Sequence, residues 1–304
     1  MKRDLYEILG IESGIAVVIL SVAIMLLCGY LMTRITKKLK LPSVTAYIIA
    51  GILIGPYFLN LIPSSVVRGT AFLPDIALAF IAFSTGEFFS FDSLKKAGWE
   101  VVLITAAESL TAALLVFLVC FCGLRINFAF SLILGSLATA TAPASTMMTI
   151  RQTKAKGDYV ETLLQVVALD DVICLIVYSI AISAASSSIS GKSADLLSIV
   201  IPILKNIAVI IISIGFGFLL KYMIGKHSTD NRLIIAIAIL FSFCGVCAIM
   251  DISPLLGCMV IGTVYINFAK DERLFAQLNY FSTPLLLLFF VRSGVSFDLS
   301  SLSV

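Results

Sequence analysis

Residues 42–55 read PSVTAYIIAGILIG, and residues 254–267 read PLLGCMVIGTVYIN. Both stretches begin with proline, and both combine small residues with β-branched ones. A second pair follows in the same order, because IAFSTGEFFSFDSL at 81–94 resembles FFVRSGVSFDLSSL at 289–302. The first pair is 212 residues apart and the second 208, so the sequence predicts an internal duplication.

The composition of the 304 residues is typical of a membrane protein. Hydrophobic residues make up 60% of the chain and charged residues 13%, with a mean hydropathy of +1.09. Soluble domains are about 45–50% apolar and about 25% charged. The net charge of +3 is small and dispersed, so we do not expect a nucleic-acid partner. The composition predicts an all-α polytopic membrane protein and excludes ordinary soluble enzymes and disordered chains.

The apolar runs predict ten membrane spans, because a spanning helix needs roughly 20 apolar residues. The ninth run is short, and the tenth contains an arginine. The expected spans are 14–34, 43–60, 70–89, 99–123, 126–148, 158–183, 198–222, 232–250, 254–268 and 281–298.

Basic residues alternate between the connecting loops. The odd-numbered loops hold 14 lysines and arginines, whereas the even-numbered loops hold only 3. Cytoplasmic loops are the basic ones, so this bias predicts a multi-pass inner-membrane protein with its N-terminus outside. Ten spans would also leave the C-terminus outside.

The two copies of the repeat would then run through the membrane in opposite directions. Residues 42–183 form the expected first inverted repeat, and residues 254–304 form the start of the second, within one transmembrane domain over residues 1–304. Inverted repeats are typical of secondary transporters, whose sites lie at the repeat interface near the midplane. The counterparts of the last three helices of the first copy would follow Val304. We therefore expect a fragment that inserts but does not transport.

The strongest candidate site lies in VETLLQVVALDDVICLIVYSI, residues 160–180. Asp170 and Asp171 occupy the centre of the expected sixth span. Ionisable groups inside a span are costly and are candidates for function. Adjacent carboxylates at low dielectric repel each other and titrate as a coupled pair. The structural alternative, in which both are only hydrogen-bonded within the bundle, stays open.

A second candidate lies in LGSLATATAPASTMMTI, residues 134–150. Pro143 has no N–H to donate to the carbonyl of Thr139, so the helix should break or kink there. The freed carbonyls and the hydroxyls of Thr139 and Thr141 are oxygen ligands suited to a small monovalent cation. A simple proline kink is the alternative.

Two further charges are weaker candidates. Glu108 lies nine residues into the expected fourth span, at the depth of a cytoplasmic funnel, and it can equally have a packing role. Arg292 lies within the expected tenth span, where we expect it to pair with a carboxylate or to reach a cavity.

Five stretches resemble the bacterial cation/proton antiporters of the sodium/proton exchanger superfamily. They cover nearly the whole chain in order: LPSVTAYIIAGILIGP (41–56), ALAFIAFSTGEFFSFDSLKKAG (77–98), TATAPAST (139–146), ALDDVICLIVYSI (168–180) and ISPLLGCMVIGTVYIN (252–267).

The resemblance implies the inverted-repeat antiporter fold with thirteen helices, of which ten are expected here, and a homodimer. It implies that two broken helices cross at the midplane and that TATAPAST belongs to the first. It implies that Asp171 is the main cation ligand and proton carrier, with Thr141 as a further candidate ligand for Na+. Asp170 would pair with a basic residue beyond Val304, and Arg292 occupies a position that is usually uncharged.

The predicted function is secondary antiport of a monovalent cation against protons by alternating access, with no cofactor. By its resemblance to the family, the Asp pair implies exchange of Na+ or Li+ rather than K+, although K+/H+ antiport remains an alternative within the family. A sodium-coupled solute symporter on a similar fold is a second alternative. An intramembrane aspartyl protease is disfavoured, because its two Asp residues face each other from different helices. We therefore expect a transporter rather than an enzyme, with the cation, protons and the lipid bilayer as partners.

Overall fold

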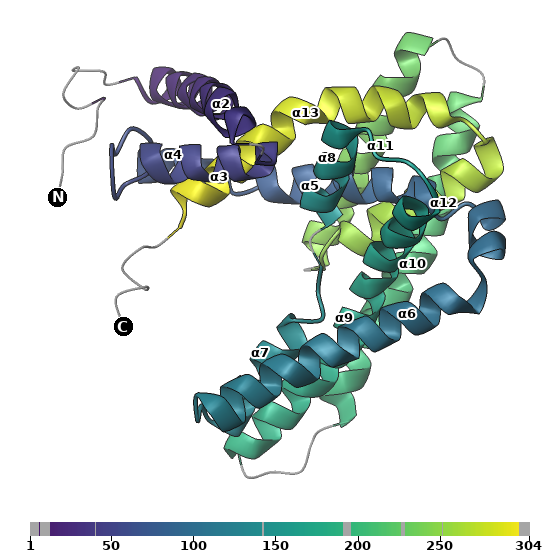
Figure 1. Cartoon of the computed structure of the whole chain (residues 1–304). Coiled ribbons are helices and arrows are strands. Elements are labelled where there is room, and N and C mark those ends of the chain that lie inside the picture. Colours follow the sequence, from purple (N-terminus) through teal and green to yellow (C-terminus); the bar gives the residue numbers. More distant parts are fainter. Residues whose placement is uncertain are drawn as a thin grey trace. The chain divides into compact units, whose positions relative to one another are not determined.

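The structure is a computed structural model that describes residues 6, 13–39, 41–141, 143–190, 196–225, 229–250 and 252–297. For some positions within helices, including Pro143 and Asp171, only the backbone is described. All regular structure in these ranges is helical (Figure 1). The helices form two compact units, which are described separately below.

Unit 1 comprises residues 1–78, 148–154 and 276–304. In it, α2 packs against α3. The hydroxyl of Ser13 caps the start of α2, and Lys37 and Lys38 lie in its last turn, where cations interact favourably with the helix dipole. Its helices are α2 (Gly14–Lys38), α3 (Ser43–Ile54), α4 (Ser64–Gly69), the beginning of α5 (Leu73–Thr85), the end of α8 (Pro143–Thr153) and most of α13 (Glu272–Val295).

Unit 2 comprises residues 79–147 and 155–275. It contains the end of α5 and part of α8 (Pro143–Thr153). The other elements are the 3-10 turn η1 (Gly86–Phe88), α6 (Phe91–Leu118), the π-helical turn η2 (Val119–Gly123), α7 (Phe128–Leu137), α9 (Asp158–Ser190), α10 (Leu196–Ile224), α11 (Thr229–Ile249) and α12 (Leu255–Ala269).

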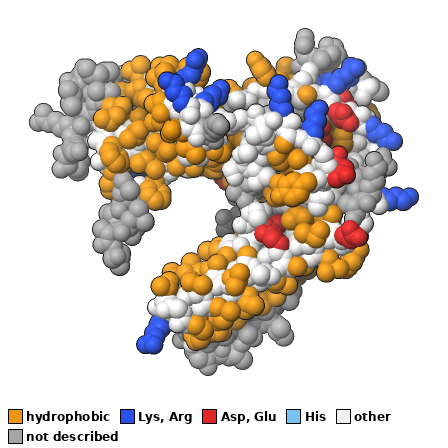
Figure 2. All heavy atoms as spheres, in the orientation of Figure 1, with side chains coloured by type: hydrophobic (Ala, Val, Ile, Leu, Met, Phe, Trp, Pro, Cys, Tyr) orange, Lys and Arg blue, Asp and Glu red, His pale blue; other side chains and the backbone are white. Residues whose placement is uncertain are grey.

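Several helices have the length and composition of membrane spans. Five described segments qualify, and three shorter helices are also apolar. Large apolar side chains lie exposed on them; on α6, for example, Leu103, Leu110 and Leu114 are 53–58% exposed. Figure 2 shows such side chains over much of the visible surface. An apolar exterior of this extent fits a surface that faces lipid. The five segments are 14–38, 98–123, 204–224, 231–249 and 272–295.

The helices agree with most of the expected spans, and the clearest differences are at the second, fifth and tenth. The expected second span, 43–60, extends past the end of α3 at Ile54. The expected fifth span, 126–148, is divided into α7 and α8, with residues 138–142 between them. The expected tenth span, 281–298, begins too late, because α13 begins at Glu272. Hydropathy detects only the apolar part of a helix, and the first turns of α13 are polar.

Two glycines allow α3 and α13 to touch within unit 1. A Cβ atom at Gly51 would lie 2.9 Å from the Cα of Gly294 and still closer to the carbonyl oxygen of Val291. A Cβ atom at Gly294 would lie 3.0 Å from the Cα of Gly51. Small residues let the backbones of membrane helices approach closely, so this crossing depends on both glycines.

A similar crossing lies in unit 2, between η1 and α12. A Cβ atom at Gly86 would lie 2.6 Å from the backbone nitrogen of Thr263. A Cβ atom at Gly262 would lie 3.2 Å from the Cα of Gly86 and closer to the carbonyl oxygen of Phe83. Each crossing therefore joins the first repeated segment of one sequence copy to the second repeated segment of the other.

Candidate ion-binding site

The carboxylate of Asp170 is fully buried within unit 2. Its exposed fraction is 0%, and its Oδ1 atom accepts a hydrogen bond from the Ser109 hydroxyl on α6. Its Oδ2 atom is also buried and has no hydrogen-bond partner among the described residues. Leaving a buried acceptor unsatisfied costs about 1–3 kcal/mol, and more for a charged group. Binding of a proton or a cation to Oδ2 would remove this cost.

Packing of α9 explains why Asp170 is buried. Both α6 and α7 lie against α9, and α10 packs on it as well. Leu164, Val166 and Val167, which precede Asp170 on α9, are buried. Gln165 is 3% exposed, and its Oε1 atom has no partner in the described part of the chain. The middle of α9 therefore carries two buried oxygen atoms, Asp170 Oδ2 and Gln165 Oε1, without a hydrogen-bond partner among the described residues.

The break in the fifth span begins directly after α7. The helix ends at Leu137, and Ala138 caps it through its backbone N–H. The buried Thr139 hydroxyl donates to the carbonyl of Ser136 at 2.7 Å, so it closes the last turn of the helix. Thr141 contributes a buried hydroxyl oxygen without a hydrogen-bond partner among the described residues.

Pro143 is the first residue of α8. Proline is favoured at this position, where a backbone N–H would have no helical partner. The predicted break at Pro143 is therefore confirmed as two short helices separated by residues 138–142 rather than one kinked helix.

Two other acidic residues, Glu108 and Asp171, are neighbours of Ser109 and Asp170 in the sequence. Glu108 precedes Ser109 on α6, but its side chain is exposed, whereas that of Ser109 is buried. The backbone of Asp171 continues α9, and its side chain lies outside the described residues. The ligand role of Asp171 and the pairing of Asp170 with a basic residue therefore stay predictions.

Arg292 has partners of a different kind from the carboxylate or cavity expected for it. Within unit 1, its Nε atom donates to the Thr70 hydroxyl at 3.2 Å, and its Nη2 atom donates to the carbonyl of Val67 at 3.0 Å. These groups form the C-terminal end of α4, where carbonyl oxygens lack helical partners and the helix dipole favours a cation. The expectation of a carboxylate partner is corrected: Arg292 caps a helix.

Comparisons with known proteins agree with this helical architecture. The family model described as "Sodium/hydrogen exchanger, transmembrane" matches residues 22–304. The chain belongs to this family. Family membership and the apolar helices together make it a multi-pass membrane protein of a transporter family.

Two similar proteins extend the comparison of this exchanger-family chain. A curated relative, the iron transporter MagA of Paramagnetospirillum magneticum strain AMB-1, is 23% identical over 90% of the chain. The chain spans 61% of that relative's length. The sodium proton antiporter MjNhaP1 from Methanocaldococcus jannaschii has the same fold, with a TM-score of 0.67 and 21% identity. That match covers 96% of this chain and 75% of the solved one.

Sequence reasoning did not single out two buried polar residues of this region, Ser109 and Gln165. Ser109 and Gln165 are polar side chains within apolar runs, as are many packing residues. The sequence of α6 did contain a signal, because Thr105 and Ser109 are four residues apart and therefore share a helix face. The structure shows that both are fully buried. A buried face with hydroxyls could have indicated where a carboxylate finds its donor.

Proposed function

We propose that this protein is a secondary antiporter that exchanges a monovalent cation for protons at the Asp170–Asp171 pair. The observation that carries the proposal is the buried carboxylate of Asp170, in which one oxygen accepts from Ser109 and the other has no hydrogen-bond partner among the described residues. Among the described residues this carboxylate has no basic partner, and a buried carboxylate is unfavourable unless a proton, a cation or a basic group neutralises it.

Each residue at the site has an assigned role. Asp171 takes up either the cation or the proton, and Asp170 carries the second negative charge. The free hydroxyl of Thr141 and the backbone freed between α7 and α8 supply oxygen ligands for Na+. Thr139 and Pro143 hold the two ends of the break, and Glu108 lies on the approach to the site.

The transport cycle is alternating access between inverted repeats, residues 42–183 and the copy that starts at residue 254. The two glycine crossings support this proposal, since each joins a segment of one copy to a segment of the other. We propose that the protein acts as a homodimer in the inner membrane with its N-terminus outside.

The preferred substrate is Na+ or Li+. An Asp pair carries two negative charges, which favours exchange of more than one proton per cation. K+/H+ antiport at the same site is the alternative within the family, and sodium-coupled symport of a solute is the alternative outside it. Iron is the substrate named for MagA, so Fe2+ belongs in the test.

The experiment uses everted membrane vesicles from cells that express a complete exchanger of this family in which residues 1–304 are those of this chain, because the 304 residues alone are expected to insert but not to transport. A fluorescent dye reports the loss of the proton gradient when Na+, Li+, K+ or Fe2+ is added. We expect Na+ and Li+ to release protons in the wild type, and Asp171→Asn to abolish this response. Asp158→Asn, an exposed position at the start of α9, is the matched control and should keep it. Near-wild-type exchange by Asp171→Asn would refute the proposed site.

A further inference from the structure

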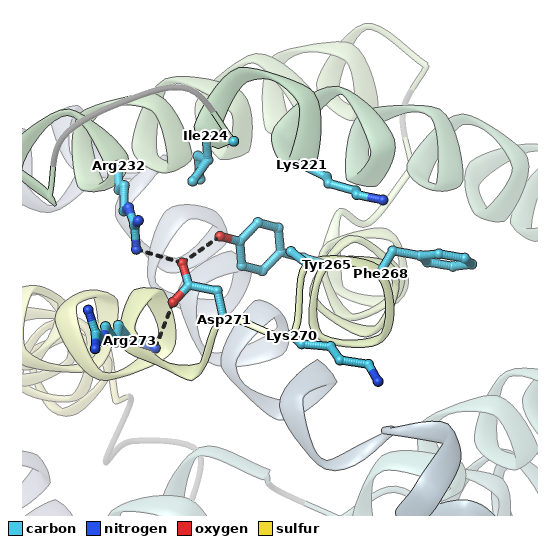
Figure 3. A pocket seen from close by; sticks show the side chains of 10 residues that line it. Lys221, Ile224, Arg232, Tyr265, Phe268, Lys270, Asp271 and Arg273 are labelled. Carbon is cyan, nitrogen blue, oxygen red and sulfur yellow. Dashed lines mark hydrogen bonds and ion pairs between the residues drawn. The ribbon is translucent and has the colours of Figure 1, made fainter.

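A cavity of about 520 Å³ lies in unit 2, away from the Asp pair. The end of α10, the beginning of α11, the end of α12 and the loop before α13 surround it (Figure 3). Charge bias predicts that the loops 225–231 and 270–271 are both cytoplasmic. Among the described residues that line the cavity, four are basic and only Asp271 is acidic.

Asp271 lies at the centre of this group, and its carboxylate already accepts three hydrogen bonds. Its Oδ2 atom accepts hydrogen bonds from Arg232 Nη1 at 2.9 Å and from the Tyr265 hydroxyl at 3.0 Å. Its Oδ1 atom accepts the backbone N–H of Arg273 at 3.2 Å. The carboxylate therefore neutralises Arg232 and fixes the loop, and it has little capacity left for other cations.

The remaining basic groups have no carboxylate partner within the described ranges. Lys221 Nζ lies over the ring of Phe268, 5.8 Å from its centroid. The side chains of Lys270 and Arg273 are exposed. Arg232 also has a buried Nε–H for which the described residues offer no partner. The cavity thus has an excess of positive charge and unused N–H donors, a combination that attracts a multiply charged oxyanion.

The backbone holds this arrangement in place. Lys270 has φ 52° and ψ 35°, the left-handed conformation that ends α12. This conformation is uncommon for residues other than glycine, asparagine and aspartate. Lys270 and Arg273, on either side of this turn, both line the cavity, as does Lys221 (Figure 3).

We propose that this cavity binds a phosphate group. Arg232 and Arg273 offer the planar donors that match phosphate oxygens, and Lys221 and Lys270 contribute point charges. The group can belong to an anionic lipid headgroup or to a soluble phosphate. Phe268 contacts the rings of Phe91 and Phe218, and all three are exposed, as are aromatic residues at a membrane–water interface.

The test measures binding by the purified chain in lipid nanodiscs. One arm compares nanodiscs of phosphatidylcholine alone with nanodiscs that also contain phosphatidylglycerol, and native mass spectrometry counts the retained anionic lipid. The other arm titrates inorganic phosphate into the phosphatidylcholine nanodiscs, with chloride at matched ionic strength. The test variant is Lys270→Asn with Arg273→Gln, because asparagine tolerates the left-handed conformation. The control variant is Lys37→Gln with Lys38→Gln, in the last turn of α2. It removes the same amount of charge from another helix end that is expected on the cytoplasmic side of the membrane.

We expect saturable binding in one arm, weakened about tenfold or more in the test variant and unchanged in the control. Binding only with phosphatidylglycerol identifies a lipid headgroup, and binding of inorganic phosphate identifies a soluble ligand. Arg273→Gln alone, at an exposed position, should weaken binding to a smaller degree and guards against misfolding of the double variant. Absence of saturable binding in both arms, or equal loss in the control pair, would overturn the proposal.

Discussion

At the scale of single residues, the state of the Asp170 carboxylate depends on one donor. The hydroxyl of Ser109 reaches it from α6, and both groups are fully buried. A hydrogen bond to a charged group contributes about 1.5–3 kcal/mol, more than a neutral one. In the proposed mechanism, Ser109 therefore determines which carboxylate oxygen is available for a proton or a cation.

Replacing Ser109 should destabilise the protein by leaving both oxygens of Asp170 without a donor. We expect Ser109→Ala to lower the free energy of unfolding by about 1–3 kcal/mol. Ser109→Thr, which keeps the hydroxyl, should recover most of this loss. Denaturant unfolding in mixed micelles measures the effect.

The control for this prediction is Thr105→Val. Thr105 is equally buried one turn away, but its hydroxyl donates only to the carbonyl of Val101 in its own helix. Thr105→Val should lower the free energy of unfolding by less than about 1 kcal/mol, since the lost hydrogen bond is neutral and local. Equal losses for Ser109→Ala and Thr105→Val would show that Asp170 does not depend on Ser109.

Arg292 should contribute to stability through its contacts with the end of α4. Arg292→Met keeps the apolar stem and removes two hydrogen bonds, so we expect a loss of about 1–3 kcal/mol in the free energy of unfolding. Arg292→Lys should be intermediate, because lysine lacks the planar fork. Thermal unfolding of the purified variants is the measurement.

Arg68→Met is the matched control, since Arg68 is exposed on α4 itself. A loss for Arg68→Met as large as for Arg292→Met would contradict the capping role.

At the scale of helices, local rules predicted some boundaries and not others. Pro143 could be read from sequence because its missing N–H acts on its own helix. The start of α13 could not, because hydropathy does not register its polar first turns. The partner of Arg292 could not either, since Thr70 is 222 residues away and only tertiary packing brings it close.

The glycine crossing of α3 and α13 should tolerate no side chain. Gly294→Ala forces a Cβ atom into the backbone of α3, so we expect a loss of about 1–3 kcal/mol from overpacking. Gly215→Ala on α10 is the control, because open space surrounds a Cβ atom there. It should be neutral or stabilise by about 0.5–1 kcal/mol through helix propensity.

Chemical unfolding of both glycine variants in the same detergent compares them directly. If Gly294→Ala is as stable as Gly215→Ala, the two helices do not touch as described.

At the scale of the whole molecule, composition and charge predicted the class of protein, and the five stretches that resemble the exchanger superfamily predicted the family. Both signals are summed over many residues, so single errors matter little. The candidate site depends on individual atoms, and its ligand roles stay predictions. The sequence indicated a special position for Asp170 and a break at Pro143, but it did not indicate the buried contacts of Ser109 and Gln165. Their roles arise from long-range packing of α6 against α9.

The charge bias makes a prediction about topology. A fusion after Lys156 should place its reporter in the cytoplasm, and a fusion after Ile126 should place it outside. Green fluorescent protein, which fluoresces in the cytoplasm, and alkaline phosphatase, which is active outside it, report the two sides. Reversed signals would contradict the proposed orientation, and equal signals on one side would contradict a span between residues 126 and 156.

The central claim is that the cation and the proton compete for the carboxylates of the Asp pair. The most direct measurement is the apparent KM for Na+ as a function of pH, from initial rates of exchange in vesicles that contain the protein. If the proton and Na+ compete for one carboxylate, KM for Na+ should fall about tenfold for each unit by which the pH rises, as long as the pH is below the pKa of that carboxylate. The reason is that the proton must leave before the cation binds. KM should then become constant at alkaline pH. An apparent KM that stays the same across the whole pH range, with only the maximal rate changing, would contradict a shared site.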